Sequence, residues 1–341
     1  MALDWTALKT RLHALARTPR GRQLLKGARW TFIIAILAFL AYQLVGIGWG
    51  ELWASLPRTP WFYVLWAVLY FQLPLIESLI YRALWRLPVR YGLPVLLRKR
   101  VLNNDVAGYS GEFYLYAWAR KEVQASASRI MGAVKDNAIA SSLGSTLAAV
   151  ITLAAFVAAG QIALVDLIDN QDPVYVTIGL LVAACLVALL VVFRRTVFTL
   201  SLRELMALFG THLGRNLAVY GLQILQWWVV FPEAPLHVWA TMLAVIIVTT
   251  RLPFLPAKDW AAMSAILGMS AVLDAPEAVI AGLLLVHSGL NHATNFILFA
   301  LASAWERTYG VDMSEMTDGD APDAPAAPAE ADEPTPSQPS R

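Results

Sequence analysis

The sequence Asn137–Gly160, NAIASSLGSTLAAVITLAAFVAAG, decides the fold class of this protein. None of its residues is Asp, Glu, Lys or Arg. A hydrocarbon core of about 30 Å needs roughly 20 helical residues, each of which adds about 1.5 Å to a helix. The stretch is longer than that, and it therefore predicts a helix that crosses a membrane.

The rest of the chain has the same character. Of its 341 residues, 58% are hydrophobic and 15% are charged, whereas soluble domains have about 45–50% and about 25%. Strands of a membrane barrel would be short and alternating, so continuous apolar runs indicate helices. We predict an all-α, polytopic membrane protein with about six to eight spans and one or two re-entrant helical hairpins. The other runs are Trp30–Ile47, Trp61–Tyr81, Pro173–Phe193, Thr211–Val230, Leu236–Thr250 and Pro276–Trp305. In the last run, His287-Ser288-Gly289 is a candidate break.

Charge divides the chain into three parts. Residues 1–29 hold seven Lys or Arg against Asp4, and residues 312–341 hold eight acids against Arg341. The chain without this tail has 25 basic and 16 acidic residues, a net charge of +9. Basic flanks favour the cytoplasmic side of a membrane. We expect a basic cytoplasmic N-terminal segment at 1–29, a transmembrane domain at 30–307 and a disordered, Ala/Pro-rich acidic tail at 312–341. We then expect a multi-pass membrane protein whose N-terminus lies on the cytoplasmic side.

Several kinds of site are not expected. Cys185 is the single cysteine, so no cysteine-based metal site or disulfide framework is predicted. His287 and His292 are five residues apart and lack the His-Glu-x-x-His spacing of a zinc site. No basic and aromatic module of a nucleic-acid-binding protein accompanies the basic body. We predict no metal, no cofactor, no nucleic acid and no catalytic residue.

The stretch Asn103–Arg120, NNDVAGYSGEFYLYAWAR, interrupts the apolar pattern. Asp105 and Glu112 would each cost roughly 2.5–3.5 kcal/mol at the centre of a lipid-facing helix, while Gly108 and Gly111 provide backbone freedom for a turn. One interpretation is a re-entrant helix–turn–helix that enters from the basic side and lines a polar cavity. The other is an amphipathic helix on the membrane surface.

A second mixed stretch, Thr250–Trp260, also combines a basic residue, helix breakers and an acid at the start of a short helix. Interrupted segments in both halves of a chain are typical of transporters built from repeats. Two interpretations stay open: two such segments around a central site, or a coincidental likeness between the two halves.

Polar residues recur at helical spacing in two later runs. Arg215, Asn216, Tyr220, Gln223 and Gln226 share one face. This face either lines a cavity, with Arg215 on a lipid phosphate, or makes interhelical hydrogen bonds. A second set, His287, Asn291, His292 and Asn295, has the same spacing, and either packing or a proton-linked role of His287 explains it. Small residues around Gly144 let helices approach closely.

Asn104, Gly108, Gly111 and Glu112 resemble the early motif of the membrane region of lysylphosphatidylglycerol synthases, which also occurs in multiple peptide resistance factors. Tyr81-Arg82-Ala83-Leu84-Trp85 is similar to an Arg-Trp-like element before it, and Arg251, Pro253, Pro256 and Asp259 are loosely similar to a late motif. The arginine that the family has soon after Glu112 is absent here, as are the late glycines. The resemblance covers roughly Trp30–Arg307. It implies a stand-alone, flippase-like transmembrane domain without the aminoacyl-transferase domain.

The resemblance implies an inner-membrane lipid translocator, or an accessory to one, that moves a polar-headed lipid. Its partners would be membrane lipids, such as an anionic or amino-modified phospholipid or a lipid-linked glycan, and a partner enzyme. Glu112 would be the central acid, and Arg82, Arg215 and Arg251 would attract phosphate. The candidate substrate-binding residues are Asn104, Asp105, Gly108, Gly111, Glu112, Arg82, Arg215, Arg251 and Asp259. A membrane-embedded lipid-modifying transferase and a non-catalytic scaffold for a lipid or envelope enzyme stay open as alternatives.

Overall fold

A computed structural model describes residues 19–106, 109–162, 198–252, 257–270, 273 and 275–309. Within these ranges the secondary structure is helical, with no strand, which confirms the predicted all-α class. The run Pro173–Phe193, the acidic tail and the first residues of the basic segment lie outside the described residues.

Three helices are long and apolar enough to cross a membrane. They are α4 (Pro60–Trp85), α7 (Ala127–Ala158) and the part of α13 (Glu277–Tyr309) up to Leu301. The prediction of a helical membrane protein agrees with these helices, and the number of six to eight spans stays a prediction. The helix α13 runs without interruption through His287-Ser288-Gly289, so the candidate break does not form. One glycine costs a helix only about 1 kcal/mol, and the tertiary packing of α13 outweighs that cost.

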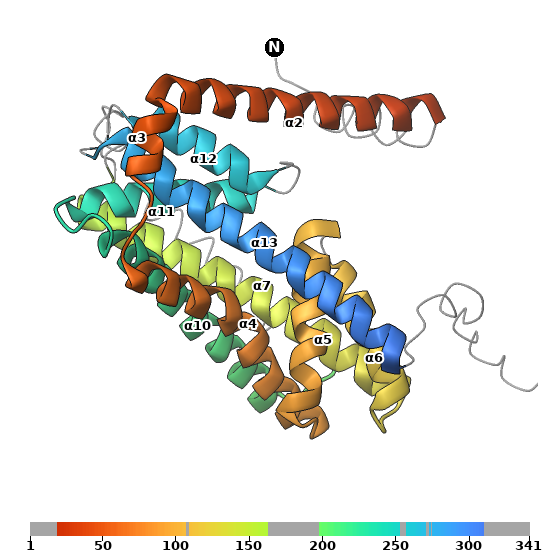
Figure 1. Cartoon of the computed structure of the whole chain (residues 1–341). Helices are drawn as coiled ribbons and strands as arrows, with labels where there is room; N and C mark the ends of the chain where they lie inside the picture. The colour runs from red at the N-terminus through yellow and green to blue at the C-terminus, as the bar shows by residue number, and fades with distance from the viewer. Residues whose placement is uncertain are drawn as a thin grey trace, which may run out of the picture.

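The remaining elements complete a bundle. Figure 1 shows α4, α7, α10 and α13 running along a common direction, with α2 crossing them at one end. The other elements are α2 (Pro19–Ile47), α3 (Trp49–Ala54), α5 (Val89–Val101), the π-helix η1 (Leu102–Val106), α6 (Ser110–Glu122), α10 (Leu202–Trp228), α11 (Leu236–Arg251) and α12 (Lys258–Gly268). The helix α2 is continuous across residues 29 and 30, where the sequence predicts the end of the basic segment.

Local signals set several helix ends. The helix α4 starts at Pro60, whose missing N–H is no loss in a first turn, and the residue that ends it, Arg86, has a left-handed backbone with φ 55°. At the start of α10, the Ser201 side chain accepts a hydrogen bond from the Glu204 N–H, and the Glu204 carboxylate accepts from the Ser201 N–H. Such a reciprocal pair is a capping box, which satisfies N–H groups that have no partner inside the helix.

The helices α7 and α10 pack closely against each other. A Cβ atom at Gly144 of α7 would lie 3.0 Å from the backbone nitrogen of Leu213 in α10, which confirms the predicted role of the small residues there. Nearer the start of α7, the buried Asp136 carboxylate accepts three hydrogen bonds of 2.8 Å, from the Thr199 N–H, the Thr199 hydroxyl and the Leu200 N–H. Asp136 therefore fixes the start of α10 beside the start of α7.

The helices α5 and α6 form an antiparallel helical hairpin. Contacts pair residues in opposite chain order: the Ser110 hydroxyl with the Leu102 carbonyl, Glu112 with Lys99, and Tyr114 with Arg98. The Arg100 guanidinium lies over the Tyr70 ring, 4.5 Å from its centroid. Tyr70 is ten residues from the start of α4 and fifteen from its end. The hairpin thus begins near the end of α4 and reaches the middle of that helix.

A second hairpin, α11 and α12, approaches from the opposite end. It follows α10, and the end of α11 lies beside the middle of α7, where the Arg251 guanidinium donates to the Ser145 and Thr146 hydroxyls at 3.0 and 3.2 Å. The Lys258 ammonium, at the start of α12, donates to the Thr250 carbonyl at 2.9 Å. The two interrupted segments of the sequence are therefore two helical hairpins.

Two apolar clusters hold these hairpins. One surrounds the buried side chains of Trp227, Trp239 and Ile266 and joins α10, α11, α12 and α13. The other contains Leu96 and Leu115, and it packs the first hairpin onto α4 and α7. In a bilayer the lipid is as apolar as these side chains, so van der Waals packing and interhelical hydrogen bonds hold the short helices inside the bundle.

Candidate functional site

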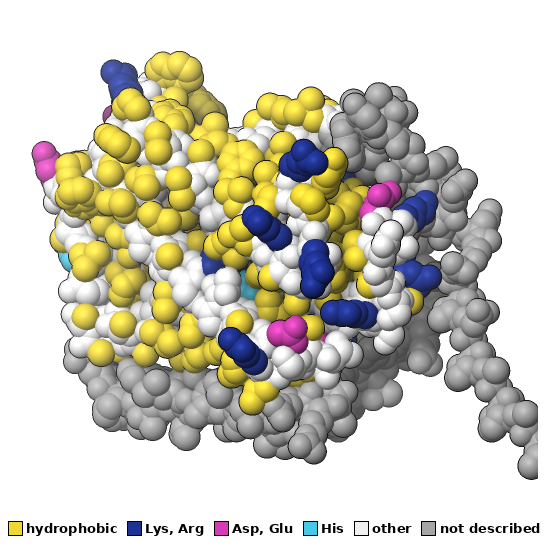
Figure 2. Space-filling model, turned by 90° about the horizontal axis from the view of Figure 1, so that it is seen from below, with side chains coloured by type: hydrophobic (Ala, Val, Ile, Leu, Met, Phe, Trp, Pro, Cys, Tyr) yellow, Lys and Arg dark blue, Asp and Glu magenta, His cyan; other side chains and the backbone are white. Residues whose placement is uncertain are grey.

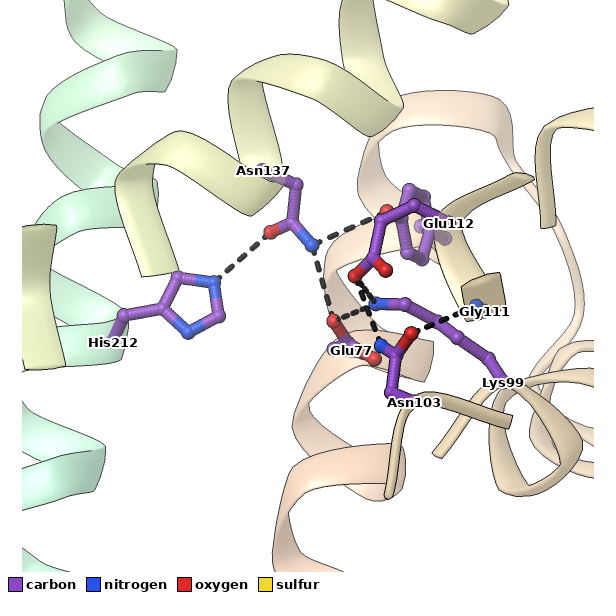
Figure 3. A network of polar contacts seen from close by, with 8 residues as sticks. Glu77, Lys99, Asn103, Gly111, Glu112, Asn137 and His212 are labelled. Atoms are coloured by element: carbon purple, nitrogen blue, oxygen red, sulfur yellow. Dashed lines mark hydrogen bonds and ion pairs between the residues drawn. The ribbon is translucent and has the colours of Figure 1, made fainter. Parts of the chain in front are cut away.

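A buried trio of charged side chains lies where the first hairpin meets α4. The Lys99 ammonium of α5 contacts the Glu77 carboxylate of α4 at 2.5 Å and the Glu112 carboxylate of α6 at 3.4 Å. The Lys99 and Glu77 side chains are 6% and 5% exposed, and that of Glu112 is 18% exposed. Figure 3 shows Lys99 between the two acids. One ammonium group therefore serves two carboxylates, of which Glu112 is the more accessible.

The start of α6 is fixed against the end of α5 by Gly111 and Asn103. The Gly111 N–H donates to the Asn103 side-chain oxygen at 2.7 Å, and the Asn103 amide nitrogen donates to the Glu112 carboxylate at 3.2 Å. A Cβ atom at Gly111 would lie 2.2 Å from the Lys99 carbonyl oxygen. Glycine is thus required by this close approach, while the positive backbone φ of 68° belongs to Tyr109. The sequence predicts Gly111 as a turn residue, and its place in the structure is a close contact inside helix α6.

Asn137 and His212 extend the trio into α7 and α10. The Asn137 amide nitrogen donates to Glu77 and to the Tyr81 hydroxyl, both at 3.2 Å, and its oxygen faces His212 Nε2 at 3.0 Å. Because the amide nitrogen points at a carboxylate, the amide oxygen accepts and His212 Nε2 carries the hydrogen. The helices α4, α5, α6, α7 and α10 and the π-helix η1 therefore contribute to one connected network, part of which Figure 3 shows.

The charges of this network are not balanced within the trio. Fully ionised, Glu77, Glu112 and Lys99 sum to one negative charge. The second Glu112 oxygen, Oε2, is buried and has no hydrogen-bond partner. A buried acceptor without a partner costs about 1–3 kcal/mol, and such exceptions among buried polar groups are uncommon. Glu112 is therefore the member of the trio with capacity for another positively charged or hydrogen-bond-donating group.

A second group of polar contacts connects α4, α10 and α13. The Tyr70 hydroxyl donates to Asn295 at 2.5 Å, the Trp66 indole donates to Asn291 at 2.9 Å, and the Gln226 amide joins His287 to the Phe62 carbonyl. Gln226 and the α13 residues His287, Asn291 and Asn295 thus make hydrogen bonds between helices. For Gln226 this is one of the two alternatives that the sequence leaves open.

The structure places the nine candidate residues in different surroundings. Gly111 and Glu112 belong to the network, and Arg215 bonds Gln72 of α4. Arg251 lies at the tip of the second hairpin. Arg82, Asn104 and Asp259 are exposed. The side chain of Asp105 and all of Gly108 lie outside the described residues.

Sequence reasoning missed Glu77, Lys99, Asn137 and His212. Glu77 carried a signal, because a lone acid inside the apolar run Trp61–Tyr81 is a functional candidate by default. Lys99 lies among arginines that indicate a cytoplasmic flank, and its 22-residue separation from Glu77 has no helical period. Only the folded hairpin brings the two together.

In the described ranges, no three His, Cys, Asp or Glu side chains are placed to hold a metal ion. A cavity of about 330 Å³ lies between α10 and α11, lined by apolar residues that include Trp228 and Trp239. It is near the end of α10, away from Glu112.

Basic side chains gather at one end of the bundle. This end of the bundle contains the end of α4, both ends of the first hairpin, and the starts of α7 and α10. The exposed basic residues of these segments are Arg82, Arg86, Arg90, Arg120, Lys121, Arg129, Lys135 and Arg203. Figure 2 shows Lys and Arg side chains gathered among hydrophobic ones on the face seen from below.

No protein-family model, curated protein or solved structure matches the chain. The resemblance to the membrane region of lysylphosphatidylglycerol synthases therefore stays a prediction from the residues named for it.

Proposed function

We propose that this protein is a lipid translocator of a bacterial-type inner membrane, or an accessory to one, and that it moves a polar-headed lipid past the first hairpin. The observation that carries the proposal is the Glu77–Lys99–Glu112 trio. Charged groups inside an apolar bundle are expensive and usually mark a pathway for ions or substrates. A bundle that only needed stability would be served as well by apolar side chains of similar volume.

The position of the trio supports access from the basic end. The first hairpin has both of its ends there, among exposed arginines such as Arg86 and Arg90. A cytoplasmic leaflet carries anionic lipids, and each Lys or Arg near its surface contributes about 1 kcal/mol of attraction. We place this end, and the N-terminus, on the cytoplasmic side.

Glu112 is the contact for the lipid headgroup. An amine-bearing headgroup that reaches Glu112 competes with Lys99 for the carboxylate, and Glu77 at 2.5 Å keeps the Lys99 charge compensated during that exchange. Charge-assisted hydrogen bonds of this kind are roughly twice as strong as neutral ones. Binding of a headgroup ammonium would also offset the one negative charge that the fully ionised trio carries.

The test is lipid movement in liposomes that contain the purified protein. A fluorescent phospholipid analogue, quenched from outside, reports transbilayer movement. Glu112→Gln should slow it at least about tenfold, because losing one member of a buried charge pair costs about 2 kcal/mol or more. Glu122→Gln, which removes an exposed carboxylate from the same helix, is the matched control. Equal rates for wild type and Glu112→Gln, at equal reconstitution, would refute the role of Glu112.

A further inference from the structure

The helices from α4 onward fall into two series with the same order (Figure 1). Each series begins with a long helix, continues with a hairpin of two short helices and ends with a second long helix. In the first series, α4, α5, α6 and α7 have 26, 13, 13 and 32 residues. In the second, α10, α11, α12 and α13 have 27, 16, 11 and 33 residues. The two series therefore match in order and nearly in length.

The two series run in opposite directions through the bundle. Glu77, late in α4, is joined through Asn137 to His212, in the first half of α10. Gln226, near the end of α10, donates to the Phe62 carbonyl, at the start of α4. The helices α4 and α10 are therefore antiparallel. The first hairpin follows α4 and enters from the basic end, whereas the second follows α10 and enters from the opposite end, which we call the far end.

The last helices of the two series are inverted in the same way. Trp66 of α4 donates to Asn291 of α13, and one turn further along both helices Tyr70 donates to Asn295, so α4 and α13 run in parallel. The helices α7 and α10 are also parallel, because both begin at the basic end. Each hairpin contacts the last helix of the other series: α5 contacts α13, and Arg251 of α11 contacts α7. A half-turn about an axis in the membrane plane would exchange the two series and these two contacts together.

The two hairpin tips share a backbone conformation and a charge pattern. A residue with a left-handed backbone precedes the second helix of each hairpin, Tyr109 with φ 68° before α6 and Ala257 with φ 52° before α12. Such a conformation is uncommon outside glycine, and among the described residues only Arg86 also has it. The first helix of each hairpin has basic residues in its last turn, and the second has an acid in its first turn, Glu112 or Asp259. This repetition supports one common plan for both hairpins.

The second tip carries charges at mid-depth of the bundle. Arg251 is exposed, and its guanidinium donates to Ser145 and Thr146 near the middle of α7, a helix long enough to span a membrane. Asp259 of the same tip is exposed as well. Charged side chains at such a depth face the interior of a bundle or a water-filled space, because lipid is a costly surrounding for them. The charges therefore indicate that water reaches the second tip.

We propose that α4–α7 and α10–α13 are the two halves of an inverted repeat, and that the tip of the second hairpin is exposed to water from the far side as the tip of the first is from the basic side. Inverted repeats related by an axis in the membrane plane are a common plan of transporters. The repeat and its two exposed tips stand on the geometry alone. That a lipid headgroup passes the second tip on the far side rests on the proposed function.

The experiment labels single cysteines of the full chain with a membrane-impermeant maleimide, added to either side of sealed vesicles, in a Cys185→Ser background. Lys121→Cys and Glu233→Cys, at exposed positions near the bases of the two hairpins, define the two sides. We expect them to be labelled from opposite sides. Tyr109→Cys should be labelled from the side of position 121, and Asp259→Cys from the side of position 233.

Labelling of both bases, or of both tips, from one side would overturn the inverted repeat. Absence of labelling at position 259 from either side would overturn the exposure of the second tip. Should Asp259→Cys not fold, Leu252→Cys at the same tip, where the native side chain is 48% exposed, is judged by the same outcomes.

Lipid movement tests the passage of the headgroup separately. Attaching the maleimide to Asp259→Cys should slow movement at least about tenfold relative to the same variant without the label, because the label fills the space beside the second tip. The label on Glu233→Cys, at the base of the hairpin, should leave the rate unchanged. Movement that depends on Glu112 but is unaffected by the label at position 259 would refute passage by the second tip.

Failure of the repeat and failure of the proposed function are distinguishable. Tips labelled from opposite sides, together with lipid movement that neither Glu112→Gln nor the label at position 259 changes, would refute the proposed function alone. Lipid movement that depends on Glu112, together with tips labelled from one side, would refute the inverted repeat alone.

Discussion

At Lys99, one ammonium group faces the carboxylates of Glu77 and Glu112. Lys99→Met keeps most of the side-chain volume and leaves two buried acids without their cation. Breaking a buried ion pair by removing one partner costs about 3–5 kcal/mol. We expect a loss of that size in the free energy of unfolding, measured by denaturant titration in detergent.

The double variant Lys99→Met/Glu77→Gln is the control for this prediction. It removes one of the two uncompensated carboxylates together with the lysine and leaves Glu112, so it should recover part of the stability that Lys99→Met loses. If the losses in the free energy of unfolding caused by Lys99→Met and by Glu77→Gln simply add in the double variant, the Lys99–Glu77 ion pair does not stabilise the protein.

A substitution at Gly111 tests whether α5 and α6 pack as closely as the structure shows. Gly111→Ala places a Cβ atom 2.2 Å from the Lys99 carbonyl, and we expect overpacking to destabilise the protein by about 1–3 kcal/mol. Gly214→Ala is the matched change, because nothing lies within 4 Å of a Cβ atom there. Thermal unfolding should show a loss for the first variant and none for the second, and equal melting temperatures would contradict the packing argument.

The sequence identifies Glu112 because an acid, two glycines and several tyrosines stand together in one short stretch. The partners of Glu112 come from α4 and α5, which only tertiary packing brings to it. A lone Glu77 in an apolar run is visible in the sequence, but nothing local says that Lys99, rather than one of the arginines beside it, faces that acid.

At the scale of elements, apolar runs and breakers predict where most described helices lie, and the ends are less well predicted. The run Asn137–Gly160 belongs to α7, which begins ten residues earlier, at Ala127. These ten earlier residues mix apolar and charged side chains, and the polar Asp136 among them and Asn137 at the start of the run are buried against Thr199 and Glu77. Hydropathy cannot detect burial of this kind, because hydrogen bonds compensate the polar groups.

The capping box of α10 makes a prediction about pH. Hydrogen bonds from the Ser201 side chain and backbone lower the pKa of Glu204 below its ordinary value of 4.5. Because the folded-state pKa is lowered, this stabilisation is present above pH 4.5 and is lost as the pH falls through the folded-state pKa. Ser201→Ala should cost about 0.5–2 kcal/mol at neutral pH.

The difference between wild type and Ser201→Ala should therefore shrink below pH 4.5. Melting temperatures recorded at neutral and acidic pH check this. A difference that stays constant with pH would mean that the Glu204 carboxylate takes no part in the cap.

At the scale of the whole molecule, two helical hairpins approach the middle of the bundle from opposite ends. The Arg100 side chain of the first hairpin reaches Tyr70 of α4, and Tyr70 bonds Asn295 of α13. In the second hairpin, the ring of Trp260 stacks on His292 of α13. The middle of α13 thus stands between the two hairpins.

We propose that α5 and α6 carry the charged trio into a membrane-spanning bundle from one side and return to that side. Labelling of single cysteines by a membrane-impermeant maleimide in sealed vesicles tests it, in a Cys185→Ser background. The positions are Arg90→Cys and Lys121→Cys, near the two ends of the hairpin, and Arg58→Cys, in the exposed loop before α4. We predict that the first two are labelled from the same side and the third from the other. Labelling of positions 90 and 121 from opposite sides would mean that the chain crosses between them, and it would contradict the account.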